Sequence, residues 1–210
     1  MALLRSATGV IAVLTAIVFV LVLVLIGEGR AFVLGGFIPA RVAGLIPLPD
    51  AIPAFLTPLT AALLHAGFAH LAFNLVILLY CGFQLERLVG AGQFVLLYIV
   101  GAYGAAAAQW LLDPVAAVPM VGASGAVSAV VGAFAVRFGK AKRVTGSRNV
   151  DRAIHVIWLL AAWVVLQLMV DWMGTMDGTL IATPAHIGGF VVGLLANGFL
   201  RVEGGPRHAL

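Results

Sequence analysis

The sequence predicts an all-α membrane protein of six transmembrane helices with both termini in the cytoplasm. Three observations carry this prediction: the composition, the lengths of the apolar stretches and the placement of the basic residues. Hydrophobic residues make up 63% of the 210-residue chain and charged residues only 10%, whereas a soluble domain averages about 45–50% apolar and about 25% charged residues. The mean hydropathy is +1.14. So little polar surface argues against a water-soluble globule, a disordered chain or a nucleic-acid-binding protein.

Six stretches are apolar and long enough to cross a bilayer, which takes about 20 residues. We expect spans at residues 8–27, 61–83, 93–112, 119–138, 153–173 and 183–201. The first resembles a signal peptide, but its apolar run from Gly9 to Ile26 exceeds the usual core of about 7–15 residues and no A-x-A cleavage site follows. We therefore interpret it as a retained helix, and residues 1–210 as a single membrane domain.

Basic residues orient the six spans. Ten of the twelve lysines and arginines precede span 1, follow span 6, or lie between spans 2 and 3 or spans 4 and 5. These ten are Arg5, Arg87, Arg137, Lys140, Lys142, Arg143, Arg148, Arg152, Arg201 and Arg207. Only Arg30 and Arg41 fall on the other side. The positive-inside rule therefore places the ten residues and both termini in the cytoplasm.

The connection between the first two spans, residues 28–60, is long and unusual in composition. Its prolines, among them Pro39 and Pro53, forbid a continuous helix. Apolar residues such as Phe37 and Phe55 make it too hydrophobic for a solvated linker. We expect the segment to lie partly embedded at the outer membrane interface, and long loops of this kind are often functional.

Polar side chains inside the spans are candidate functional residues, because their burial in a membrane is costly. His65, His70, Asn74, Ser124 and His186 lie in the first halves of spans 2, 4 and 6. These three spans all enter from the outer side, so the five residues share a depth of roughly 5–15 Å at about 1.5 Å per residue. That shared depth predicts one site. The other polar residues within the spans are Gln109, Ser128, Gln167 and Asn197.

Ser124 and His186 are a candidate nucleophile and base. Gly122 and Gly125 flank the serine and permit close approach of a substrate, and backbone N–H groups of its first helical turn can stabilise an oxyanion. A serine hydroxyl needs a base, and histidine is the usual one. The GxxxG segment at residues 189–193 permits close packing of span 6 against span 4. The alternative is that these small residues serve helix packing alone and that the histidine caps its helix.

His70 and Asn74 are spaced i, i+4 and therefore share one face of span 2. Both side chains can donate hydrogen bonds, as an oxyanion hole requires. A metal or haem site formed by His65, His70 and His186 is an alternative interpretation. A proton-coupled transporter is disfavoured because no Asp or Glu lies clearly within a span. The lone cysteine, Cys81, rules out a disulfide framework and a Cys-based zinc site.

At these residues the chain resembles the rhomboid family of intramembrane serine proteases. The resemblance covers roughly residues 55–200, and its motifs occur in the family's order on the expected spans. The matching pieces are His65-Ala66-Gly67-Phe68-Ala69-His70-Leu71 with Phe73-Asn74-Leu75, Glu86-Arg87 with Gly90, Tyr98, Gly122-Ala123-Ser124-Gly125-Ala126, and Ala185-His186-Ile187-Gly188-Gly189 with Gly193. Each motif is weak alone, whereas the ordered set is specific.

The resemblance implies a rhomboid-like six-helix bundle and an intramembrane serine endopeptidase that cleaves transmembrane segments near the outer leaflet. It implies Ser124 as nucleophile and His186 as general base and then acid. It implies that His70 and Asn74, with the backbone N–H of the serine, hold the oxyanion. The supporting residues would be Gly122, Gly125 and His65. The long first loop would be the family's membrane-embedded loop and span 5 its lateral gate.

The same resemblance implies that no cofactor and no metal takes part. It implies single-span membrane proteins and the lipid bilayer as partners, and no nucleic acid. Two positions depart from the pattern of many relatives: Leu56-Thr57 stands where Trp-Arg is common, and Ser128 stands where an aromatic residue packs on the catalytic histidine. A rhomboid-like protein that binds its partners without cleaving them is the main alternative, followed by a transporter or haem protein. The compact size leads us to expect a multi-pass protein of a bacterial inner (plasma) membrane.

Overall fold

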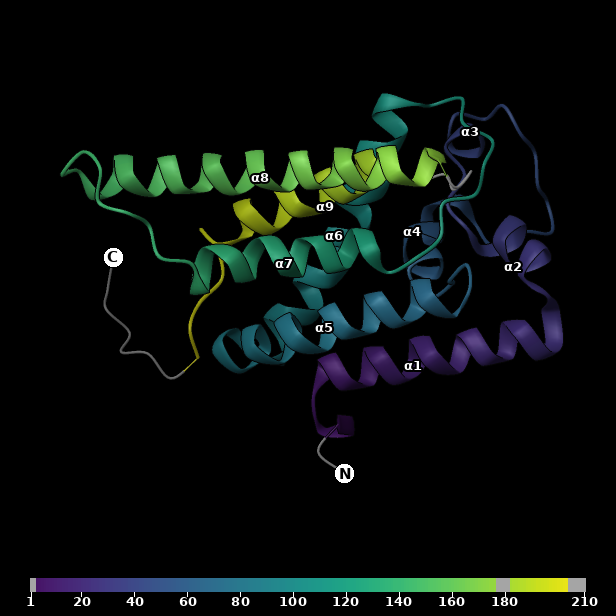
Figure 1. The fold of residues 1–210 in the computed structure, drawn as a ribbon. Coiled ribbons are helices and arrows are strands. Elements are labelled where there is room, and N and C mark those ends of the chain that lie inside the picture. The colour runs from purple at the N-terminus through teal and green to yellow at the C-terminus, as the bar shows by residue number, and fades with distance from the viewer. Residues whose placement is uncertain (1–2, 177–181, 204–210) are drawn as a thin grey trace.

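The computed structural model describes residues 3–176 and 182–203, and the regular structure in these two ranges is helical apart from one isolated bridge between Phe37 and Met120 (Figure 1). The predicted all-α class is therefore confirmed. The long helices are α1 (Ala7–Leu21, continued by a π-helical turn at Val22–Ile26), α5 (Phe68–Val89), α6 (Ala91–Leu112), α7 (Ser124–Phe138), α8 (Arg148–Met176) and α9 (Thr183–Ala196). The short ones are 3₁₀ turns at Leu3–Arg5 and Ala54–Leu56, and α2 (Glu28–Gly35), α3 (Pro39–Val42) and α4 (Thr57–Ala61).

Four helical stretches in the described ranges are long and apolar enough to cross a membrane. They are Ala7–Ile26, Phe68–Val89, Ala91–Leu112 and Arg148–Val170. Helices α7 and α9 are also apolar but have only 15 and 14 residues. At about 1.5 Å per residue they span about 21–23 Å, less than the hydrocarbon core of about 30 Å. The chain is an integral membrane protein in which two short helices stand among longer ones.

Polar contacts join several helix ends at one end of the bundle. The Glu86 carboxylate, near the end of α5, accepts hydrogen bonds from the backbone N–H groups of Ala7 and Thr8 at 2.8 Å each. A carboxylate at the start of a helix is favourable because unpaired N–H groups and the helix dipole meet there. Arg137, near the end of α7, donates to the side chain of Asn197 at 2.9 Å, just after α9. Helices α1, α5, α7 and α9 are thereby held at this end.

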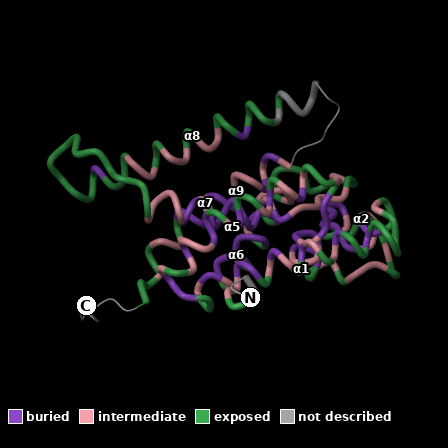
Figure 2. The backbone as a smooth tube through the Cα atoms, turned by 60° about the horizontal axis from the view of Figure 1, so that its bottom comes forward, coloured by how far each residue is buried: buried purple, intermediate pink, exposed green. Residues whose placement is uncertain are grey.

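Small residues bring α7 and α9 into close contact at the centre of the bundle. A Cβ atom on Gly189 would overlap the carbonyl oxygen of Gly125, and one on Gly193 would overlap that of Ala129. Packing of this kind lets helix backbones approach closely inside a membrane. Figure 2 shows the buried backbone concentrated in α5, α6, α7 and α9, with α8 lying along the outside. The predicted packing of span 6 on span 4 is confirmed.

Two helices begin later than the sequence predicted, and glycine is the reason. The span expected at 61–83 turns at its first residues, and α5 begins only after Gly67, whose φ is 88°. The span expected at 119–138 begins as a helix only at Ser124, after Gly122 with a φ of 119°. Positive φ values suit glycine and interrupt a right-handed helix. The placement of His65 within a spanning helix was therefore wrong, because it lies in the turn before α5.

The segment 28–60 forms short helices rather than one continuous helix, as its prolines predicted. Phe37 is buried, and its backbone exchanges two hydrogen bonds with Met120, at 3.0 and 2.8 Å. The Arg41 guanidinium donates to the carbonyl of Ile52 at 2.6 Å and closes the segment on itself. This long connection is thereby attached to the strand-like segment that leads into α7.

Candidate active site

Three helix N-termini converge around Ser124. It is the first residue of α7, while His70 and His186 lie in the first turns of α5 and α9. The first turn of a helix carries unpaired backbone N–H groups and the positive end of the helix dipole. An arrangement of this kind favours a negative charge that develops in the space between them.

The structure brings the candidate nucleophile and base into direct contact. Oγ of Ser124 lies 2.7 Å from Nε2 of His186, a hydrogen-bond distance for an O–H donor. The residues are far apart in sequence and meet because α7 and α9 pack through their small residues. Their proximity follows from the packing of α7 on α9, which was predicted from the small residues of spans 4 and 6.

The second ring nitrogen of His186 contacts a residue for which the sequence analysis assigned no role. Nδ1 lies 2.7 Å from Oε1 of Gln167, which is on α8 and is 6% exposed. An amide oxygen accepts hydrogen bonds and cannot donate one, so the hydrogen between the two atoms belongs to Nδ1. Nε2 then holds a lone pair that can accept the Ser124 hydroxyl proton. The signal in the sequence was an amide in the outer half of span 5, at the depth of the other site residues.

His65 positions the turn that leads into α7. Its Nε2 accepts a hydrogen bond from the backbone N–H of Ala123 at 3.3 Å, and the side chain is 1% exposed. Burial, and to a smaller extent the neighbouring His70, lowers the pKa of this imidazole, which lies outside the spanning helices, to about 4. The ring is therefore neutral at physiological pH and suited to accept this bond. Its role here is to support the loop that carries Ser124.

His70 presents a hydrogen-bond donor to the space beside Ser124. Its Nδ1 accepts from the backbone N–H of Ala66 at 3.3 Å, so in the neutral ring the hydrogen lies on Nε2. A Cβ atom on Gly122 would lie 2.7 Å from that Nε2 and 3.5 Å from Oγ of Ser124. The glycine therefore keeps open a space bordered by both side chains, and its left-handed φ gives a second reason why no other residue suits the position.

Asn74 lies one turn after His70 and is 5% exposed. Its Nδ2 donates to the backbone carbonyl of His70 at 2.9 Å. An amide nitrogen carries two hydrogens, so this contact leaves the group able to donate a second bond. The orientation of the amide is set by α5 itself rather than by a neighbouring helix.

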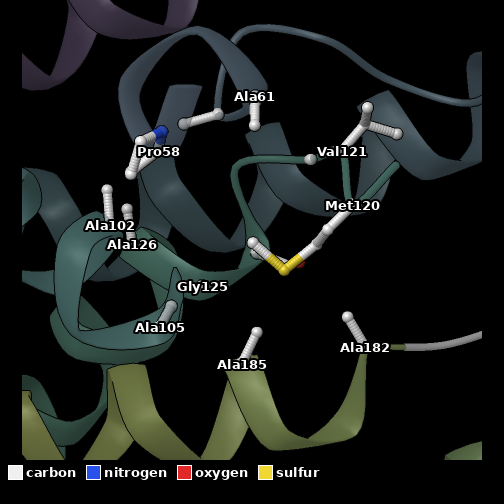
Figure 3. A pocket seen from close by; sticks show the side chains of 13 residues that line it. Pro58, Ala61, Ala102, Ala105, Met120, Val121, Gly125, Ala126, Ala182 and Ala185 are labelled. Carbon is white, nitrogen blue, oxygen red and sulfur yellow. The ribbon is translucent and has the colours of Figure 1, made fainter. Parts of the chain in front are cut away.

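A small pocket opens beside Ser124 (Figure 3). It is lined mostly by alanine and glycine from α4, α6, α7 and α9, and the side chain of Met120 extends across it toward Gly125 and Ala185. Its volume is about 10 Å³, room for about one water molecule.

Four imidazole nitrogens of His65, His70 and His186 are engaged in hydrogen bonds within the protein. The rings of His65 and His70 have centroids 5.0 Å apart, but Nε2 of the first and Nδ1 of the second accept bonds from backbone N–H groups. In the ranges that the structure describes, no group of three His, Cys, Asp or Glu side chains is placed to hold a metal ion.

Comparison with known families agrees with this geometry. A family model described as the Rhomboid domain matches residues 54–202. The chain belongs to the rhomboid family. The rhomboid match includes α4 to α9 and every candidate site residue, whereas α1, α2 and α3 precede it.

Three rhomboid relatives illustrate the similarity. Over 134 residues the chain is 33% identical to "Rhomboid protease GlpG" of Yersinia enterocolitica, covering 64% of this chain and 44% of that protein. Over 76 residues it is 40% identical to "Rhomboid protease GluP" of Bacillus subtilis, covering 36% of this chain and 14% of that protein. Over 130 residues it is 29% identical to "RHOMBOID-like protein 5" of Arabidopsis thaliana, covering 62% of this chain and 39% of that protein. The chain thus spans less than half the length of these rhomboid relatives.

Proposed function

We propose that this chain is an intramembrane serine endopeptidase that cleaves transmembrane segments of membrane proteins near the outer leaflet. The observation that carries the proposal is the 2.7 Å contact between Oγ of Ser124 and Nε2 of His186 at the start of α7 and α9. The Yersinia and Bacillus relatives are named rhomboid proteases, which supports the same reaction class.

In the acylation step, Oγ of Ser124 attacks the scissile carbonyl carbon while Nε2 of His186 takes the hydroxyl proton. The carbonyl oxygen becomes an oxyanion, which the Nε2–H of His70, the amide of Asn74 and the Ser124 backbone N–H stabilise. The imidazolium then gives its proton to the leaving amine as the C–N bond breaks. One peptide product departs and the other remains esterified to Ser124.

In the deacylation step, water attacks the ester carbon and gives a proton to His186, and the imidazolium returns it to Oγ as the ester bond breaks. The pocket that Ser124 lines has room for about one water molecule, which is the co-reactant this step consumes. No cofactor or metal is needed for either step. Glycines 122 and 125 and His65 keep the loop before α7 open and ordered around the reacting atoms.

We further propose that the protein crosses the membrane six times as one domain, with both termini cytoplasmic and the site toward the outer face. The four long apolar stretches together with α7 and α9 supply six spans. The contacts of Glu86 and Arg137 hold the start of α1 and the end of α9 at one end, where most basic residues lie. A bacterial inner membrane fits the bacterial source of two relatives, and single-span membrane proteins are the expected substrates.

A cleavage assay with a single-span model substrate tests the proposed function. Purified protein in liposomes is expected to cut the substrate at one position near its outer end, and the Ser124→Ala variant is expected to leave it intact. Identical products from the two proteins would refute the assignment of the nucleophile. A folded wild-type protein that binds but never cuts the substrate would favour a binding function instead.

A further inference from the structure

We propose that Gln167 is a positioning residue of this site: its amide oxygen holds His186 in the tautomer that can accept the proton of Ser124. The inference rests on the proposed function of the serine–histidine pair and deepens it. It assigns to α8 the role of orienting the candidate base.

Four polar atoms from three residues form a continuous chain of contacts through the imidazole ring of His186. Gln167 Oε1 to His186 Nδ1 is 2.7 Å, and His186 Nε2 to Ser124 Oγ is also 2.7 Å. A neutral imidazole carries one hydrogen, and the hydrogen bond made by one nitrogen decides the state of the other. With the hydrogen on Nδ1, Nε2 is a base; with the hydrogen on Nε2, it is a donor that cannot take a proton from the serine.

A second residue of α8, Trp163, also contacts His186 and holds Gln167 beside it. Trp163 lies one helical turn earlier on the same face of α8. Its indole N–H donates to the backbone carbonyl of His186 at 3.3 Å, and its ring stacks on Phe190 with centroids 4.6 Å apart and an interplanar angle of 6°. Helix α8 therefore contacts both the backbone and the side chain of the candidate base.

Helix α8 packs against little else among the described helices. Only 6% of an apolar 18-residue window within Arg148–Val170 is buried, against 28–33% of the corresponding windows in the other three candidate spans. Among the described helices its main packing partner is α9, and Figure 1 shows it lying lengthwise along the outside. The contact of Gln167 with His186 is thus one of few that α8 makes, and it requires α8 to be packed against α9.

The test removes the acceptor while keeping the length of the side chain. In protein labelled with ¹⁵N-histidine, the wild-type His186 signal is expected to show Nδ1–H, and Gln167→Met is expected to raise the fraction with Nε2–H. Loss of one neutral hydrogen bond predicts a fall in kcat/KM of about 3- to 10-fold, mainly in kcat. The His186→Asn variant identifies the signal.

The matched control is Gln84→Met. This amide lies on α5, where it donates to the carbonyl of Tyr80 at 3.0 Å, and its removal is expected to leave the tautomer and kcat/KM unchanged. An unchanged His186 tautomer in Gln167→Met would overturn the proposal. The tautomer is measured without any turnover. A negative result here is therefore distinct from failure of the proposed function, which would appear as cleavage of the substrate by the Ser124→Ala variant.

Gln167→Glu provides the second variant, and it keeps the proposal falsifiable if Gln167→Met does not fold. A carboxylate also accepts from Nδ1–H, so the Nδ1–H tautomer is expected to persist. Its negative charge favours the imidazolium, and the acid limb of the pH profile of kcat/KM is expected to move to higher pH. A carboxylate this close to the ring would move the acid limb whatever the role of the native amide, so the tautomer is the deciding measurement: loss of the Nδ1–H form in Gln167→Glu would refute the positioning role.

Discussion

At the scale of single residues, Ser124 differs from the other serines of the chain by its place rather than by its chemistry. Ser128, one turn later on α7, donates its hydroxyl to the Ser124 carbonyl at 2.7 Å and is committed to the helix backbone. Ser124 instead faces Nε2 of His186 at the helix start. The same functional group is therefore structural at one position and a candidate nucleophile at the other.

The serine and histidine are expected to act as a unit. Ser124→Ala and His186→Ala should each lower kcat by about 10⁴–10⁶-fold with helix content unchanged, as for other serine–histidine pairs. Since either loss removes the whole nucleophile–base step, the double variant should be no slower than the slower single variant. Circular dichroism and a cleavage assay measure both quantities, and a clear additional loss in the double variant would contradict the pair.

Asn74→Ala should reduce activity without abolishing it. Removal of one oxyanion donor is expected to lower kcat by about 10–10³-fold, while Nε2–H of His70 and the backbone N–H of Ser124 remain. Single-turnover kinetics on the model substrate measure the effect. An unchanged kcat would mean that the Asn74 amide, which binds the carbonyl of His70, serves helix geometry alone.

Ser128→Tyr should lower both the melting temperature and the rate. Ser128 is 3% exposed, and a Cβ atom placed on Gly189 would lie 3.2 Å from the Cβ of Ser128. The backbone of α9 therefore already occupies the space that a ring would need. Overpacking of this kind costs about 1–3 kcal/mol. Thermal unfolding in detergent and kcat measure the outcome, and a faster enzyme with an unchanged melting temperature would show that room for a ring exists.

At the scale of helices, the contact between α7 and α9 determines the position of the site. The two helices carry Ser124 and His186 in their first turns, and glycines further along hold their backbones together. Any change that separates these helices changes the distance between the reacting atoms.

Gly193→Ala tests this dependence away from the site itself. Its Cβ would overlap the carbonyl oxygen of Ala129, so the helices must separate, at a cost of about 1–3 kcal/mol in unfolding free energy. We expect a lower melting temperature and a kcat reduced by about 10-fold or more through misplacement of His186. The control Gly92→Ala, where no atom lies within 4 Å of the new Cβ, should leave both unchanged; equal effects of the two variants would refute the argument.

At the scale of the whole molecule, charge should determine orientation in the bilayer. In a Cys81→Ser background, single cysteines at two exposed positions, Asp50→Cys and Lys142→Cys, report the two sides. A membrane-impermeant maleimide added to intact cells should label the first and not the second, because basic segments remain in the cytoplasm. Labelling of Lys142→Cys alone would invert the proposed topology and place the site toward the cytoplasm.

Prediction from sequence succeeded where a property is local to the chain. The prolines of the segment 28–60 correctly excluded a continuous helix, and the small residues at 189–193 correctly indicated a close helix contact. It was wrong at the start of the second span, because hydropathy continues through residues 62–67 although the backbone turns at Gly67. A hydropathy profile indicates which segments avoid water, but it carries no information on the backbone dihedral angle φ.

The sequence by itself determined the membrane class, the candidate serine and histidine and the family, because composition, spacing and motif order are written along one chain. Only the tertiary structure decided that Gln167 contacts Nδ1 of His186 and that His65 supports the loop before α7. Both contacts depend on how a helix or turn is rotated against a neighbour distant in sequence. The rotation of each helix about its axis depends on the packing of the whole bundle. Apolar helix faces of similar hydropathy differ in shape, and which faces fit together is decided only when the helices assemble.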